Sequence, residues 1–192
     1  MSNSGVFDVN DIRHLMDYQQ WSGVGTLELI DTQTSSAFTI MDFTNIKQDI
    51  YNVHLITVND YLGTADGERA AMRYFENGTI ESGNNYQYAT QQCDTGGFGE
   101  SKSTSTSSVP ITKNSGTAGN ETSSGYSYIY NAGDSTKYTF NTYHSTAISN
   151  SGTYNSWFGS GVMTQASTVD GFRLFGGANA RATVSLYGIR YS

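Results

Sequence analysis

The chain has 192 residues, of which 21 are glycine and 14 are tyrosine, and only 14% of them are charged. The net charge of −7 argues against binding to nucleic acid or to anionic membrane surfaces, both of which attract basic patches. Aromatic and β-branched residues are plentiful and strong helix formers are scarce, which predicts an all-β protein. The sequence shows neither a signal-peptide pattern nor an apolar run long enough to span a bilayer, so we expect synthesis in a cytosol.

Residues 1–22 differ from the rest and predict a short helical leader. Asp8 can cap the helix, with Asp11 three positions later. An isolated helix of about ten residues is marginal in water, so the leader must pack against something. We expect it to dock on another subunit or on a larger particle, or to fold back over an open end of its own domain. The apolar residues available for this contact are Phe7, Val9, Ile12, Leu15, Met16 and Trp21.

From residue 23 onward the sequence predicts strands separated by Gly, Asn and Ser turns. Asn77-Gly78 is a strong signal for a tight hairpin. Residues 51–58 carry apolar side chains on both faces, which predicts a strand buried on both sides. Together the pattern favours a jelly-roll-like antiparallel β-sandwich over residues 23–192. The expected strands cover 26–31, 37–43, 51–58, 69–75, 86–93, 126–130, 137–144, 156–164, 171–175 and 181–187.

Residues 96–124 change character, with two glycines, a run of Ser and Thr, the single proline and Asn/Gly repeats. This composition predicts a long polar loop, with room for a short edge strand around 109–112. Compact domains rarely keep so long a loop without a use for it. We therefore expect it to be mobile in the free protein and ordered against a neighbour.

Three groups of residues near the C-terminus form a recognisable series: Trp157-Phe158, Gly171 to Phe175, and Ala182 to Ile189. Phe43 to Ile46 and Arg73 to Gly78 agree with it earlier in the chain. The series resembles that of a family of β-sandwich virion proteins from tailed phages of marine bacteria and cyanobacteria, which end in a strand reading Ser-Leu-Tyr-Gly-Ile.

The resemblance implies a non-enzymatic structural protein on the virion surface, bound to other virion proteins and trimeric. A capsid decoration or cement protein, or a small surface appendage, fits this description. The first alternative is a receptor-binding or carbohydrate-binding module of a tail or neck fibre, with a host surface glycan as its partner. The second alternative is an enzyme such as a depolymerase.

No catalytic, metal or cofactor site is expected from the residue pattern. His14, His54 and His144 stand far apart and lack the paired spacing of zinc ligands. The lone Cys93 has no basic neighbour that would activate its thiol, so it is interpreted as a small buried strand residue, with a nucleophile as the alternative. A further acidic group, Asp60, Asp66 and Glu68, is interpreted as a solvated turn, with a Ca²⁺ site as the alternative.

Tyrosines alternate along two of the predicted strands, at Tyr86 and Tyr88 and at Tyr126, Tyr128 and Tyr130. Alternation places each set on one face of its strand. One interpretation is a sandwich core with cross-strand pairing. The other is an aromatic platform for a sugar or a protein partner, formed by Tyr86, Tyr88, Tyr126 and Tyr128.

Overall fold

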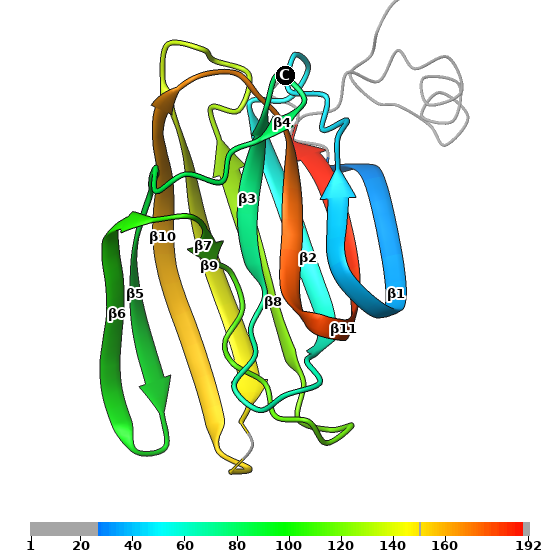
Figure 1. Cartoon of the computed structure of the whole chain (residues 1–192), viewed down its shortest axis with the longest axis vertical. Helices are drawn as coiled ribbons and strands as arrows, with labels where there is room; N and C mark the ends of the chain where they lie inside the picture. Colours follow the sequence, from blue (N-terminus) through cyan, green and yellow to red (C-terminus); the bar gives the residue numbers. More distant parts are fainter. Residues whose placement is uncertain (1–26, 150, 190–192) are drawn as a thin grey trace, which may run out of the picture.

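The structure is a computed structural model that describes residues 27–149 and 151–189, and its regular elements are all β (Figure 1). The all-β antiparallel architecture expected from the composition is confirmed. Among the described residues no helix is long and apolar enough to cross a membrane. The strands are β1 Leu27–Phe43, β2 Val53–Leu62, β3 Ala71–Glu76, β4 Thr79–Ile80, β5 Tyr86–Asp94, β6 Gly97–Thr106, β7 Val109–Pro110, β8 Ser123–Tyr130, β9 Tyr138–Ile148, β10 Tyr154–Ala166 and β11 Val169–Ile189.

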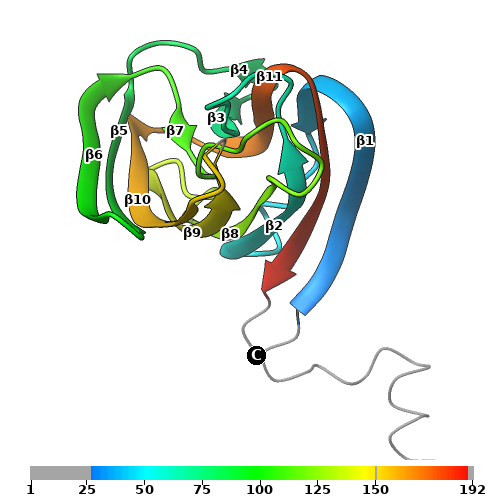
Figure 2. The ribbon, with the colours of Figure 1, turned by 90° about the horizontal axis from the view of Figure 1, so that it is seen from below.

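The strands form one antiparallel sheet that curls around a core, as the end-on view in Figure 2 shows. Its order is β4-β3-β11-β2-β8-β9-β10-β5-β6, with β1 paired to β11 and β7 paired to β3. Along β11, the segment 169–175 pairs with β3 and the segment 181–189 pairs with β2. β11 therefore joins β3 to β2, and the sheet curls along this strand.

Two pairs of expected strands are in fact single long strands. The predicted breaks at 32–36 and 176–180 are bends inside β1 and β11, which pair with each other along almost their whole length. The ladder has register shifts between Ser35 and Phe38 and between Phe38 and Ile40, where the two strands bend together. Bulges of this kind increase local twist without ending a strand, so turn-forming residues gave a misleading signal here.

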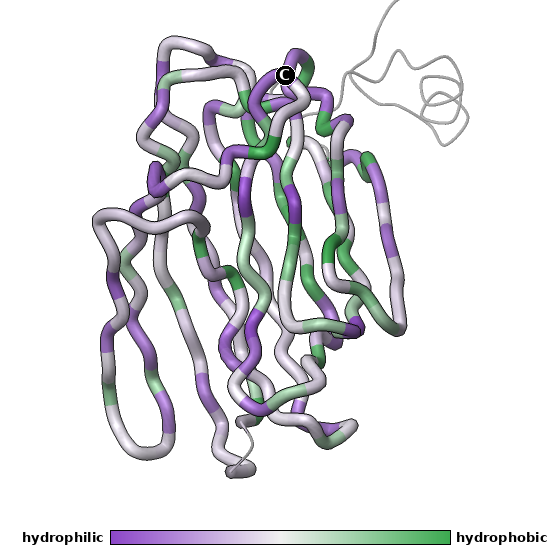
Figure 3. Tube along the Cα trace, in the orientation of Figure 1, coloured by the Kyte–Doolittle hydropathy of each residue, from purple (hydrophilic) through white to green (hydrophobic). Residues whose placement is uncertain are grey.

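The core lies inside the curled sheet, and most of its side chains come from β1, β2, β3 and β11. Phe43 and Phe172 stack with ring centroids 4.6 Å apart. In Figure 3 the hydrophobic colour gathers on β2, β3 and β11, whereas β5, β6 and β10 are paler or hydrophilic. Side chains that are fully buried include Ile46, Ile56, Tyr61, Tyr74, Tyr86, Ile129, Met163, Val184 and Leu186. Phe172 and Leu186 belong to the C-terminal motifs, so these motifs are core positions.

The prediction of a long polar loop over residues 96–124 is wrong for much of the segment. Residues 97–106 form β6, which pairs with β5 as the outermost strand of the sheet. An edge strand exposed on both faces needs no apolar alternation, so its Ser and Thr residues did not predict a strand. The short edge strand expected around 109–112 is present as β7. Residues 117–120 remain an exposed connection.

The segment that follows β6 enters the interior instead of crossing the surface. Val109, Ile111 and Lys113 are buried, and Val109 packs against the backbone of Gly161 on β10. A Cβ on Gly161 would lie 2.6 Å from Cγ1 of Val109, so the glycine makes the space for β7. Lys113 places its Nζ 4.5 Å from the centre of the Trp157 ring, which compensates for part of the cost of burying the charge.

The tight hairpin predicted at Asn77-Gly78 is confirmed as the β3–β4 turn. Both residues have positive φ, 50° and 75°, as a two-residue turn of this type requires. The expectation that 51–58 is buried on both sides also holds for its first half, since Val53 and His54 are both buried although they point to opposite faces.

Candidate functional site

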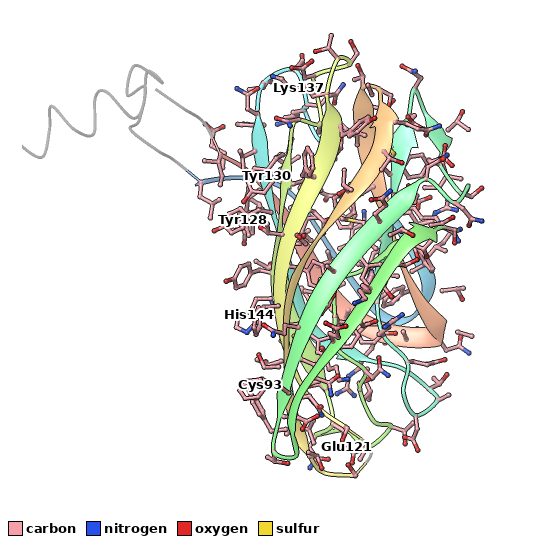
Figure 4. All side chains as sticks on the ribbon, turned by 90° about the vertical axis from the view of Figure 1, so that its left-hand side faces the viewer. Cys93, Glu121, Tyr128, Tyr130, Lys137 and His144 are labelled. Atoms are coloured by element: carbon pink, nitrogen blue, oxygen red, sulfur yellow. The ribbon has the colours of Figure 1, made fainter. Side chains whose placement is uncertain are left out.

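The outer face of the sheet carries a row of aromatic side chains on β8, β9 and β10. On β8 the side chains of Tyr126, Tyr128 and Tyr130 point outward, while the intervening Ser127 and Ile129 are buried. The ring centroids of Tyr126 and Tyr128 are 5.8 Å apart, and those of Tyr128 and Tyr130 are 6.4 Å apart. Figure 4 shows Tyr128 and Tyr130 projecting from the same side of the molecule as His144.

The two neighbouring strands extend this row across the sheet. In the β8–β9 ladder, His144 stands opposite Tyr126 and Phe140 opposite Tyr130. In the β9–β10 ladder, Phe158 stands opposite His144. The exposed fractions of Tyr126, Phe140 and Phe158 are 43%, 44% and 46%, which is high for large apolar rings. We call the six residues Tyr126, Tyr128, Tyr130, Phe140, His144 and Phe158 the aromatic face.

The aromatic face is hollowed on both sides of Tyr126 and His144. One depression, of about 610 Å³, lies over β8, β9 and β10 and is lined by rings of the aromatic face together with Thr142 and Ser160. The other, of about 490 Å³, lies toward β2 and β11, and we call it the Thr57 hollow. Neither depression is lined by an Asp, Glu, Lys or Arg of the described chain. The side chains that line the Thr57 hollow are Thr57, Asn59, Ser124, Tyr126, His144, Thr146 and Tyr187.

Hydrogen bonding and ring contacts fix the geometry around His144. Its Nε2 is 2.9 Å from Oγ of Ser156, and its ring meets that of Tyr126 edge-on at 5.9 Å between centroids. The imidazole is therefore held between a hydroxyl on β10 and a phenol ring on β8. Such a site offers ring surfaces and hydrogen-bonding groups side by side, which are features of ligand-binding surfaces.

The four tyrosines proposed as a contact platform do not share one surface in the structure. Tyr126 and Tyr128 lie on the aromatic face, as that interpretation requires. For Tyr86 the platform interpretation is wrong: it is fully buried, accepts a hydrogen bond from the Tyr74 amide and donates one to the carbonyl of Glu81. Tyr88 is half-buried against the core. Alternation gives a common face within each strand, but the sheet topology decides which face is inside.

Sequence reasoning missed Phe140, Phe158, Thr57 and Tyr187 as members of this surface. A signal for Phe140 was present, because Tyr138, Phe140 and Thr142 alternate with the buried Thr139 and Asn141. Thr57 and Tyr187 had no such signal, since their proximity to Tyr126 depends on the pairing of β2 with both β8 and β11.

Among the residues that the structure describes, His54, His144 and the acidic residues Asp60, Asp66 and Glu68 form no metal-binding cluster. His54 is buried, its Nε2 lies 2.7 Å from the carbonyl oxygen of Ile46, and burial lowers its pKa. Asp60 forms an ion pair with Arg181 at 3.0 Å, while Glu68 accepts hydrogen bonds from the amides of Thr64 and Ala65. Within the described ranges no group of three His, Cys, Asp or Glu side chains could hold a metal ion.

No family model matches the chain, and no curated protein matches it. The likeness to phage virion proteins therefore remains a prediction from the motifs, and the surface just described is the feature from which a function can be argued.

The proposed docking leader lies outside the described residues, which begin at Leu27. This applies to Phe7, Val9, Ile12, Leu15, Met16 and Trp21, and also to His14. Their docking role stays a prediction.

Proposed function

We propose that this chain is a non-enzymatic structural protein displayed on the surface of a tailed-phage particle, as a capsid decoration protein or a small appendage. The proposal includes a homotrimer, a jelly-roll-like sandwich and a helical leader that docks on a virion protein. The observation that carries it is the aromatic face, whose depressions no Asp, Glu, Lys or Arg of the described residues lines, on a molecule whose net charge is −7.

Physical chemistry supports an attachment role for this face. Contiguous exposed apolar surface is uncommon on proteins that work alone, and it marks places where a partner covers it. Tyrosine and phenylalanine are enriched at the centres of such interfaces because they bury a large area with few rotatable bonds. The face lies within the sheet, where the ladder hydrogen bonds hold the backbone, so little order has to be gained on binding.

Particle composition and attachment test the proposal. Copy number per particle, measured by quantitative mass spectrometry of purified phage, should be on the order of hundreds for capsid decoration and about a dozen for a tail or neck part. Replacing two rings of the aromatic face, Phe140→Ser with Phe158→Ser, should abolish incorporation while the melting temperature is kept. Phe98→Ser is the matched control, because Phe98 is 83% exposed and lies at the tip of the β5–β6 hairpin. Absence of the protein from purified particles would contradict the proposal.

A receptor-binding or carbohydrate-binding module of a tail or neck fibre is the second candidate. The Thr57 hollow favours it, since this depression combines rings with hydroxyl and amide groups. Binding of the isolated protein to host cells distinguishes this candidate from a protein that serves the particle alone.

A further inference from the structure

The Thr57 hollow differs in chemistry from the rest of the aromatic face. Aromatic rings stand at its sides, Tyr126 from β8 and Tyr187 from β11, and the imidazole of His144 borders it from β9. Hydroxyl and amide groups lie between them, from Thr57, Asn59, Ser124 and Thr146. The hollow thus presents apolar planes and short polar groups within one depression of about 490 Å³.

Several of these polar groups have no partner in the described part of the chain. The side chains of Thr57, Asn59 and Thr146 form no hydrogen bond there, and none of them has a further interaction of another kind. Ser124 is different, because its Oγ accepts a hydrogen bond from the Asp60 amide at 3.1 Å. The unpaired hydroxyls and amide can exchange water for a ligand with little loss of protein hydrogen bonding.

Charges are present at the rim but are mutually satisfied. Arg181 donates two hydrogen bonds to the carboxylate of Asp60, Nε to Oδ2 at 3.0 Å and Nη2 to Oδ1 at 3.1 Å. Each group is thus paired with the other, and no Asp, Glu, Lys or Arg of the described residues lines the hollow itself. A neutral ligand therefore fits this site better than an anionic or cationic one.

The backbone beneath the hollow cannot pair with a peptide. Thr57 is paired on both sides, with Tyr126 of β8 and with Ser185 of β11, so these strands have no free edge here for strand addition. A small neutral ligand with both apolar and hydroxyl faces needs no free strand edge, and it can contact the rings and the polar groups of the hollow at the same time.

We infer that the Thr57 hollow binds a neutral saccharide. The CH face of a pyranose ring packs on Tyr126 or Tyr187, and its hydroxyls hydrogen-bond to Thr57, Asn59 and Thr146. The inference rests on the proposed surface display, which brings the hollow into contact with glycans outside the particle. It assigns a ligand class to this part of the surface and leaves Phe140 and Phe158 to attachment.

Titration of the full chain with three neutral probes, maltohexaose, cellohexaose and mannohexaose, tests the site. Calorimetry and ligand-observed NMR detect the binding. At least one should bind saturably. Thr57→Val removes a hydroxyl without changing the shape, and Tyr126→Ala removes a ring, and each should weaken binding about tenfold or more. Tyr154→Ala is the matched control, because Tyr154 is similarly exposed, at 47% against 43% for Tyr126, but lies outside the hollow.

Two results would overturn the saccharide site: no saturable binding of any of the three probes, or binding that Thr57→Val and Tyr126→Ala leave unchanged. Where Tyr126→Ala loses the fold by circular dichroism, Thr57→Val alone decides. Failure of surface display gives a different result, since the isolated protein would still bind the probe while being absent from particles. If only the saccharide site is wrong, the isolated protein binds none of the probes, but both the native protein and Thr57→Val are still incorporated into particles.

Discussion

The ring of Tyr51 lies across Gly188, at the place where any other residue would carry its Cβ. A Cβ built on Gly188 would be 2.4 Å from both Cγ and Cδ2 of Tyr51. The hydroxyl of Tyr51 reaches further and donates a hydrogen bond to Oε2 of Glu28 at 2.5 Å, and Glu28 is the residue paired with Gly188 on β1. One side chain thus crosses β11 and joins the segment before β2 to β1, which explains a glycine within the Ser-Leu-Tyr-Gly-Ile motif.

Gly188→Ala should destabilise the protein by about 1–3 kcal/mol, because the added methyl group would overlap the Tyr51 ring and force it to move. Urea unfolding followed by circular dichroism measures the change. Gly119→Ala is the control, since nothing lies within 4 Å of a Cβ at that glycine, and its stability should match the native protein. Equal stability of the two variants would contradict this account of the motif.

The ion pair between Arg173 and Asp42 should contribute measurably to the free energy of unfolding, unlike the exposed ion pairs. Arg173 donates Nε to Oδ1 and Nη2 to Oδ2, both at 2.6 Å, between directly paired residues of β11 and β1. Arg173→Lys loses the two-pronged geometry and should cost about 1 kcal/mol in unfolding free energy. The comparison variant is Lys102→Met, which removes the exposed pair with Glu100 and should change stability little. A loss in the second variant as large as in the first would refute the distinction.

Alkaline pH should destabilise the fold through its buried tyrosines. Burial raises the pKa of Tyr61 and of Tyr143 to about 12 in each case. The unfolded chain loses these protons near pH 10, so their contribution is complete below about pH 10 and is lost as pH rises toward about 12. At about pH 11 each tyrosine should lower the unfolding free energy by about 1.4 kcal/mol.

Urea unfolding at a series of pH values measures this loss. Tyr143→Phe should show a shallower decline above pH 10 than the native protein, because all other groups titrate in both. Since the hydroxyl of Tyr143 also hydrogen-bonds to Thr90, the variant is compared by its pH slope and not by its absolute stability. Identical slopes would show that Tyr143 does not carry this effect.

Proteolysis should distinguish the two halves of the segment that the sequence presents as one loop. Residues 117–120 are exposed and are held by Glu121, whose Oε2 accepts hydrogen bonds from the amides of Thr117 and Ala118 at 3.1 and 3.0 Å. A protease of broad specificity should cut the free protein there first, and Glu121→Ala should make cleavage several times faster. Trypsin should cut slowly after Lys102, because this residue is paired with Ala89 in the sheet. Rapid tryptic cleavage at Lys102 would instead indicate that β6 is not formed in solution.

The sequence by itself determined the strand content, the Asn77-Gly78 hairpin and the alternation of Tyr126, Tyr128 and Tyr130, because these depend on local propensity and on the period of two along a strand. Which tyrosines face outward was decided by the sheet order, since Tyr86 follows the same alternation and is buried. The prediction of a loop over residues 96–124 was wrong for a related reason. An edge strand such as β6 has no buried face, so its sequence carries no apolar alternation. The Thr57 hollow is purely tertiary, because β2, β8, β9 and β11 bring together residues from 57 to 187 that share no local pattern.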